Sequence, residues 1–215
     1  MDAFKPETIP DPAVRRISLY LRQLEAFRKS DRKTISSKQL GSSLGLTDAQ
    51  VRRDLGYFGQ FGHPGVGYRV DELISKLRQI LGTDKTWNVL LVGVGNLGRA
   101  LCAYAGFEAK GFKLVAVFDR DPTKIGGQLA RFTVRPLSDL PEVVRQQEIR
   151  VAMLAVPADS AQEVADLLVS AGIRGILNFA PAPVNVPEHV SLNSVDLALQ
   201  LEQISFQVSL AMMKK

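Results

Sequence analysis

The sequence predicts an α/β fold built on a parallel sheet, with a small helical domain before it and one long helix after it. Short aliphatic segments alternate with helical stretches beyond residue 85, which is typical of a parallel sheet covered by helices on both faces. Amphipathic helical patterns precede residue 60, and the final segment is strongly apolar. We therefore predict domains at 1–84 and 85–193, and a C-terminal dimerisation helix at 194–215.

Composition and charge narrow the class of protein. The chain has 215 residues, is 46% hydrophobic and contains a single cysteine, Cys102, so it can build a core without an internal disulfide. It has no apolar leader pattern and no apolar run of membrane-spanning length, which predicts a cytoplasmic protein with no membrane partner. Residues 1–84 hold 14 Lys and Arg against 10 Asp and Glu. This basic excess indicates contact with a polyanion, or else a solvated basic face.

The first domain has the element order of a winged helix-turn-helix. Apolar residues at helical spacing predict a helix over 12–28. Ser36 with Gln39, and then Thr47 with Gln50, form two capping-box patterns that begin a second and a third helix. The glycine-rich "FGHPGVGYRV" predicts a hairpin, the wing, and a linking helix follows near 71–81.

The third helix is the predicted DNA-reading element. Val51, Leu55 and Phe58 recur at i, i+4 and i+7 and should face inward, which leaves another face for contact with DNA. Glutamine and arginine pair with adenine and guanine edges in the major groove, and lysines and hydroxyls hold phosphates. The alternative is a solvated helix with an Asp48–Arg52 ion pair. The predicted DNA-binding residues, wing included, are Lys38, Gln50, Arg52, Arg53, Tyr57, His63 and Arg69.

The second domain opens with a dinucleotide-binding pattern, which makes it Rossmann-like. The strand "NVLLV" runs into G-x-G-x-x-G and then into a helix. These glycines allow a tight turn, close approach of a pyrophosphate, and close packing of helix on strand. Asp119, 21 residues beyond Gly98, ends the next strand and can bind the adenosine ribose, which favours NAD over NADP. Arg120, beside it, could instead bind the 2′-phosphate of NADP, so that cofactor stays an alternative. For Asp119 the alternative is a simple strand-end turn. The turn residues are Gly93, Val94, Gly95, Asn96, Leu97 and Gly98.

The sequence offers no credible catalytic base beside this pattern. The two histidines, His63 and His189, lie in the wing and in a distant loop, and no cluster has metal-ligand spacing. We therefore predict a ligand sensor with no metal rather than an enzyme. The alternatives are an NAD-dependent oxidoreductase and a regulator that senses another adenine nucleotide, such as coenzyme A.

The last helix, over 194–212, carries apolar residues on two opposed faces. Leu197, Leu201 and Ile204 lie on one side, and Leu199 and Phe206 lie on the other. Such a helix needs two partners, which predicts a homodimer in which the helix is exchanged between subunits. Burial within a single larger core is the alternative.

Taken together, the motifs resemble those of the Rex family of redox-sensing repressors over nearly the whole chain. The segments are "SSKQLGSSLGLTDAQVRRDLGYFGQFGHPGVGY", "LVGVGNLGRAL", "VFDRDPTKIG", "LAVPA", "GILNFAP" and "SVDLALQLEQISF". The resemblance implies a homodimer with a domain-swapped C-terminal helix, which binds palindromic operator DNA and is released by NADH, with NAD⁺ as the other sensed form. It further implies that Arg22, Tyr104 and Asp196 couple the cofactor site to the DNA-binding domain, and that Tyr104 lies at the cofactor site.

Overall fold

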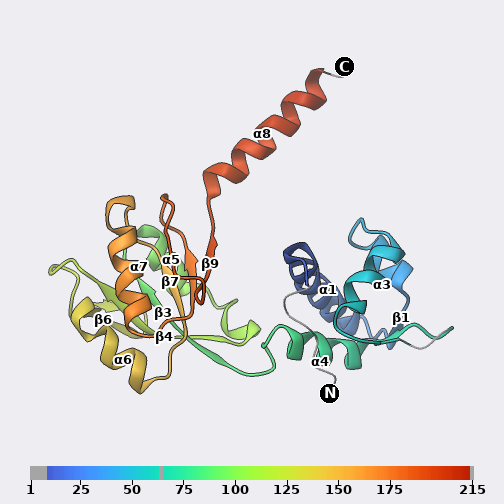
Figure 1. Ribbon diagram of the computed structural model, residues 1–215, viewed down its shortest axis with the longest axis horizontal. Helices are drawn as coiled ribbons and strands as arrows, with labels where there is room; N and C mark the ends of the chain where they lie inside the picture. Colours follow the sequence, from blue (N-terminus) through green and yellow to red (C-terminus); the bar gives the residue numbers. More distant parts are fainter. Residues whose placement is uncertain (1–8, 63–64, 214–215) are drawn as a thin grey trace. The chain divides into compact units, whose positions relative to one another are not determined.

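The computed structural model describes residues 9–62 and 65–213, and the chain divides into two compact units, Met1–Lys85 and Thr86–Lys215 (Figure 1). The first unit is helical, with one small antiparallel sheet. Its elements are α1 (Asp11–Lys29), β1 (Thr34–Ile35), α2 (Ser37–Ser42), α3 (Asp48–Gly56), β2 (Tyr68–Arg69) and α4 (Val70–Ile80). One core joins all four helices, because the apolar stripes of α1, α3 and α4 meet there.

The capping patterns predicted in this unit have two different outcomes. At α2 the box is complete, because Ser36 Oγ accepts from Gln39 N while Gln39 Oε1 accepts from Ser36 N. At α3, Thr47 Oγ1 accepts from Gln50 N, but the Gln50 side chain bonds to Asp54 instead of returning to the cap. The second capping box is therefore only half formed.

The hairpin predicted for the wing is wrong for the part of the segment that the structure describes. Tyr68 and Arg69 of β2 pair with Ile35 and Thr34 of β1, which precedes α2. Gly67 has φ +83° and packs so closely on this strand that a Cβ would lie 2.5 Å from the carbonyl oxygen of Ile35. The wing segment is thus held by a strand that is distant in the sequence.

The second unit contains a seven-stranded sheet in the order β5-β6-β4-β3-β7-β8-β9. All neighbours pair in parallel except β5, which is antiparallel to β6. The strands are β3 (Trp87–Val92), β4 (Phe112–Asp119), β5 (Gln128–Leu129), β6 (Phe132–Pro136), β7 (Val151–Leu154), β8 (Gly175–Asn178) and β9 (Ser191–Ser194). The chain order reverses between β3 and β7, which is the switch point where ligands bind in open α/β sheets.

Helices cover both faces of this sheet, as predicted. Leu90 and Val92 of β3 face one apolar cluster, and Val89 and Leu91 face the other, following the two-residue period of a strand. The first cluster includes residues of α6 (Leu140–Gln146) and α7 (Ala161–Ser170), and the second is packed by α5 (Asn96–Ala103). Short 3₁₀ turns lie at Glu108–Lys110, Leu137–Asp139 and Ala158–Ser160.

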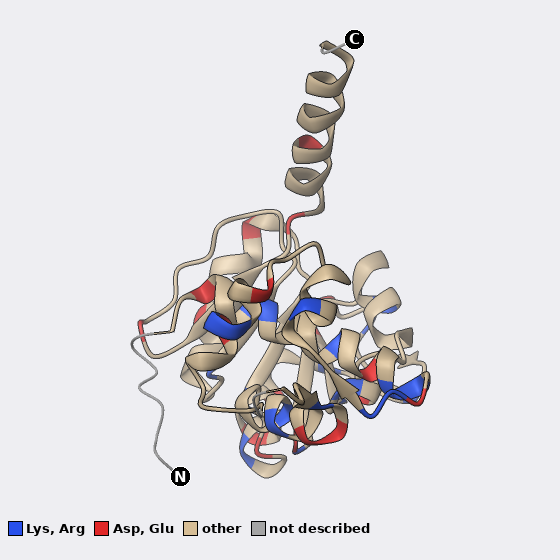
Figure 2. Ribbon diagram, turned by 90° about the vertical axis from the view of Figure 1, so that its right-hand side faces the viewer, with Lys and Arg blue, Asp and Glu red and all other residues tan. Residues whose placement is uncertain are grey.

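The last helix, α8 (Leu197–Met213), is exposed along its whole length. It begins at Leu197 rather than at 194, because Asp196 Oδ1 accepts from Leu199 N and caps it. Figures 1 and 2 show α8 standing away from the sheet of its own unit. Its Leu201 and Phe206 side chains are 67% and 66% exposed, and Glu202 is the one charged residue within its bounds. Burial of both faces in the core of the same subunit is therefore excluded.

Candidate nucleotide-binding and nucleic-acid-binding sites

A cavity of about 720 Å³ lies at the carboxyl ends of β3, β4 and β7, a volume in the usual range for small-molecule sites. The glycine turn forms one side of it, and the loop after β7 forms another. Of the eight predicted cofactor residues, Gly98 and Tyr104 lie outside its lining, and six contribute to it: Gly93, Val94, Gly95, Asn96, Leu97 and Asp119.

The three glycines of the turn meet different surroundings. Gly93 has φ +101°, and a Cβ there would lie 2.2 Å from the carbonyl oxygen of Ala155. A Cβ on Gly98 would lie 1.9 Å from the carbonyl oxygen of Gly93, so helix α5 packs on the turn only without a side chain. Gly95 has φ −77° and lines the cavity, and a Cβ on it would meet no protein atom within 4 Å. The protein itself does not require glycine at 95, whereas a ligand approaching the backbone would.

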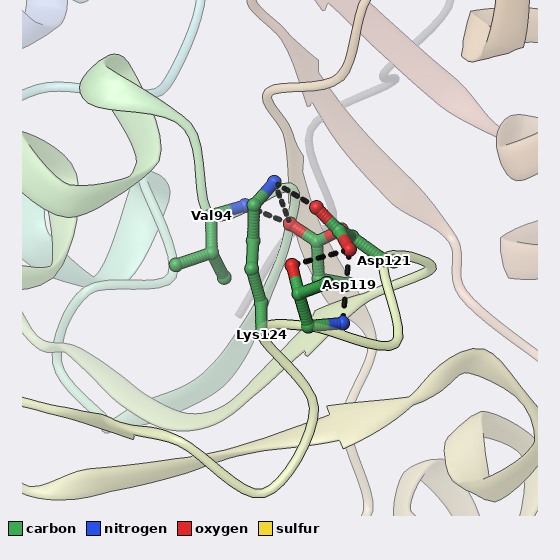
Figure 3. Close-up of polar contacts among 5 residues, drawn as sticks. Val94, Asp119, Asp121 and Lys124 are labelled. Carbon is green, nitrogen blue, oxygen red and sulfur yellow. Dashed lines mark hydrogen bonds and ion pairs between the residues drawn. The ribbon is translucent and has the colours of Figure 1, made fainter.

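Asp119 lies in the wall of this cavity with its carboxylate already hydrogen-bonded (Figure 3). Oδ2 accepts from Val94 N at 2.7 Å and from Lys124 Nζ at 3.3 Å, and Oδ1 accepts from Asp121 N at 2.9 Å. Burial alone would raise the pKa of Asp119, but these hydrogen bonds and the Lys124 charge outweigh it and lower the pKa. Asp119 is therefore an ionised acceptor that also fastens the glycine turn to the end of β4.

Two cations accompany this acid in the cavity lining, Arg120 and Lys124. Lys124 bridges Asp119 and Asp121, at 3.3 and 3.4 Å, and the sequence analysis did not single it out. Its signal was the spacing in "DRDPTK", where the turn after β4 brings the lysine back to both acids. The N-terminus of α5 has no side-chain cap among the described residues, which leaves backbone N–H groups for an anion.

The predicted DNA-reading residues lie on two helices and the wing of the first unit. Lys38 on α2 and Arg53 on α3 are exposed. Arg52 forms the predicted pair with Asp48 at 2.7 Å and also donates to Ser37 Oγ at 3.1 Å. Arg69 pairs with Glu72 at 3.1 Å. Gln50 and Tyr57 are half-buried, and His63 lies outside the described residues.

Asp54 is a buried residue of α3 that the sequence analysis missed. Its side chain is fully buried and faces α1. Oδ2 accepts from Arg16 Nε at 2.5 Å and from the Tyr20 hydroxyl at 2.6 Å, and Oδ1 accepts from Arg16 Nη2 and Gln50 Nε2, both at 2.8 Å. Burial raises the pKa of Asp54, but the hydrogen bonds from Arg16, Tyr20 and Gln50 outweigh it and lower the pKa. Asp54 therefore stays ionised and holds α3 on α1.

Comparisons with known proteins identify the family of this chain. A family model described as a CoA binding domain matches residues 84–182, and one described as a putative DNA-binding protein N-terminus matches residues 8–56. The redox-sensing transcriptional repressor Rex of Carboxydothermus hydrogenoformans is 49% identical over 97% of this chain and 99% of its own length. That of Pelotomaculum thermopropionicum is 46% identical over 93% and 94%. The chain belongs to the Rex family.

Solved structures of a Rex-family repressor, RSP, match both units of the chain at once. The complex of RSP with β-NAD⁺ and operator DNA has a TM-score of 0.90 and 38% identity, and covers 95% of this chain and 94% of that one. The complex with β-NADH has a TM-score of 0.86 and 37% identity, over 96% and 97%. These relatives are repressors by name, not enzymes.

Two kinds of feature are absent from the part of the chain that the structure describes. None of its helices is long and apolar enough to cross a membrane. Within residues 9–62 and 65–213, three or more His, Cys, Asp or Glu side chains do not gather anywhere in a way that could hold a metal ion.

The three residues to which the Rex resemblance assigns a coupling role lie in different units. Arg22 is exposed on α1 of the first unit. In the second unit, Asp196 caps α8. Tyr104 is 61% exposed and contacts Phe107 edge to face, with ring centroids 4.9 Å apart. Asp196 and Tyr104 thus have local structural contacts, and Arg22 is exposed to solvent. That the three residues together couple the cofactor site to the DNA-binding domain stays a prediction.

Proposed function

We propose that this chain is a DNA-binding transcriptional repressor that senses the NADH/NAD⁺ ratio, and that NADH binding to its Rossmann-like domains releases it from palindromic operator DNA. The observation that carries the proposal is the likeness of 95% of the chain to a repressor solved with β-NAD⁺ and operator DNA. One relative thus accounts for both the nucleotide cavity and the reading helices. As a DNA-binding repressor, the protein would act in the cytoplasm.

In the nucleotide site, the turn from Gly93 to Gly98 would bind the pyrophosphate and Asp119 the adenosine ribose. The open position at Gly95 and the uncapped N-terminus of α5 support the first assignment, since both leave backbone N–H groups accessible. The ionised Asp119 supports the second, because a carboxylate accepts hydrogen bonds from ribose hydroxyls. Lys124 would orient the carboxylate.

In the DNA-binding unit, α3 would enter the major groove, with Gln50, Arg53 and Tyr57 toward base edges. Contacts to phosphates, or to the DNA groove that the wing enters, would come from Lys38, Arg52, His63 and Arg69. A dimer reads two half-sites only when its recognition helices match the helical repeat of DNA. The exposed apolar faces of α8 support a homodimer that exchanges this helix. Arg22, Tyr104 and Asp196 would link the two functions.

The redox preference follows from the cost of burying charge. The Rex resemblance implies a nicotinamide pocket at the dimer interface. The reduced nicotinamide is uncharged and the oxidised ring is cationic, so an apolar pocket there would bind the reduced form better. The dimer could adopt an open form whose recognition helices fit both half-sites and a closed form that misses one of them. If NADH binds the closed form better than the open form, it shifts the population toward the closed form.

A gel shift on a palindromic operator, titrated separately with NADH and NAD⁺, tests the proposal. NADH should release the DNA at concentrations at which NAD⁺ does not. Equal affinities for the two nucleotides in a calorimetric titration would contradict the redox preference. Because residues 84–182 match a CoA binding domain, coenzyme A is the competing ligand and forms a third arm. Release by coenzyme A but not by NADH would replace the proposed ligand.

A further inference from the structure

The side chain of Gln50 has only one orientation that its surroundings allow. An ionised carboxylate accepts hydrogen bonds and donates none. Asp54 fills its four acceptor positions with two bonds from Arg16, one from Tyr20 and one from Gln50 Nε2. The Gln50 amide must therefore turn its nitrogen toward Asp54, which leaves its oxygen on the opposite side.

The amide oxygen that results is available to an outside donor. None of the residues that the structure describes donates a hydrogen bond to Gln50 Oε1, and this oxygen is not sealed from solvent. Gln39, at the same position of α2, differs because its Oε1 accepts from Ser36 N at 2.9 Å and closes its capping box. The two helices share one local sequence pattern, so the bond to Asp54 is the reason that the Gln50 side chain does not bond back to its N-cap residue, Thr47.

We propose that Asp54 is a positioning residue that sets the base preference of α3, by fixing Gln50 so that it presents a hydrogen-bond acceptor to the major groove. The base read at that position is then one recognised through its exocyclic amino group, adenine N6 or cytosine N4. This inference rests on the proposed DNA-binding function and specifies it further.

The place of Gln50 in the helix supports a direct reading role. It is the third residue of α3, and residues at the N-terminal end of a recognition helix contact base edges. Guanine O6 and thymine O4 are acceptors, so they cannot pair with Gln50 Oε1. The second N–H of the amide remains available, and it would add a bond to adenine N7.

The test begins with a duplex selected by the wild-type full-length chain from a randomised library. Fluorescence anisotropy at one salt concentration then compares wild type with Gln50→Ala over duplexes altered at one base pair of each half-site. The pair whose alteration affects wild type but not Gln50→Ala is the pair that Gln50 reads. At that pair, the base with the amino group is replaced by an analogue that lacks it, purine for adenine or 2-pyrimidinone for cytosine.

Wild type should lose about tenfold in affinity when the amino group is removed, and Gln50→Ala should lose nothing further. In Asp54→Asn, the new amide oxygen at the Oδ2 position still accepts from Arg16 Nε and the Tyr20 hydroxyl. Its nitrogen then lies at the Oδ1 position, where the bond from Arg16 Nη2 is lost and the Gln50 amide must reverse to accept from it. This variant should be indifferent to the amino group and should prefer a different base pair there. Tyr20→Phe is the matched control, because it removes one bond to Asp54 and keeps the bond from Gln50. It should unfold at lower temperature and keep the wild-type base preference.

Equal weakening of Asp54→Asn on all duplexes, with the amino group still read, would make Asp54 only a structural residue and overturn the inference. If Asp54→Asn does not fold, wild type and Gln50→Ala decide, since a wild type that tolerates removal of the amino group overturns it equally. The inference is also overturned if no base pair is found whose alteration affects wild type but not Gln50→Ala. A wild type that selects no duplex fails at an earlier step, and then the proposed function falls with the inference.

Discussion

Replacing Gly95 by alanine should weaken NADH binding and leave the fold intact. Its backbone angles, φ −77° and ψ −169°, suit alanine, and the new methyl group would meet no protein atom within 4 Å. The methyl would occupy the cavity side of the turn, where a pyrophosphate must reach the backbone. Loss of one hydrogen bond to a charged group costs about 1.5–3 kcal/mol, which corresponds to a dissociation constant about 10 to 150 times higher.

Gly98→Ala is the matched control, because its methyl group meets protein instead of the cavity. The Cβ would lie 1.9 Å from the Gly93 carbonyl oxygen, so α5 must move, at a cost of about 1–3 kcal/mol or more in the free energy of unfolding. Calorimetric titration with NADH and thermal unfolding separate the two effects. Gly95→Ala should change only the first measurement, and its operator affinity without nucleotide should equal that of wild type. An NADH affinity within threefold of wild type, or an unfolding temperature lowered as in Gly98→Ala, would refute the reasoning.

Three further predictions concern the other parts of the molecule. Arg53→Ala should weaken specific operator binding by about 1–3 kcal/mol if Arg53 contacts a base edge, and an unchanged ratio of specific to non-specific affinity would argue against a base contact. Because the pKa of folded Asp54 lies below its ordinary value, its ionised form stabilises the fold above the unfolded pKa of about 3.9, and this stability is lost as the pH falls through the folded pKa. The difference in unfolding free energy between wild type and Asp54→Asn, measured in denaturant, should therefore shrink from pH 7 to pH 3, and a constant difference would contradict the ion pair. Phe206, which is 66% exposed, lies on an apolar face of α8. Phe206→Glu places a charge on that face and should shift the dimer toward monomer in sedimentation, whereas an unchanged mass would place the dimer contact elsewhere.

Local sequence patterns determined most of the second unit. Strands β3, β4, β7 and β8 were predictable because each is a short aliphatic run bounded by turn residues. Strands β5 and β6 were not predicted, since they are short and lack such a run. The glycine turn was equally predictable, since a positive φ at Gly93 and close backbone contacts at both Gly93 and Gly98 leave no room for a side chain. The complete capping box at Ser36 is a local feature of the same kind.

Contacts between residues distant in the sequence decided what the pattern left open. Asp54 reads as a solvated acid within α3 until α1 places Arg16, 38 residues earlier, and Tyr20, 34 residues earlier, against it. The pairing of β2 with β1 and the engagement of Asp119 by the Val94 N–H depend likewise on how separate elements pack. A sequence shows periodicity and turn chemistry because these act over a few residues. The partner of a buried charge is chosen by packing across the whole domain, so only the tertiary structure shows that the helix predicted to read DNA is held, and its glutamine oriented, by a carboxylate from inside the protein.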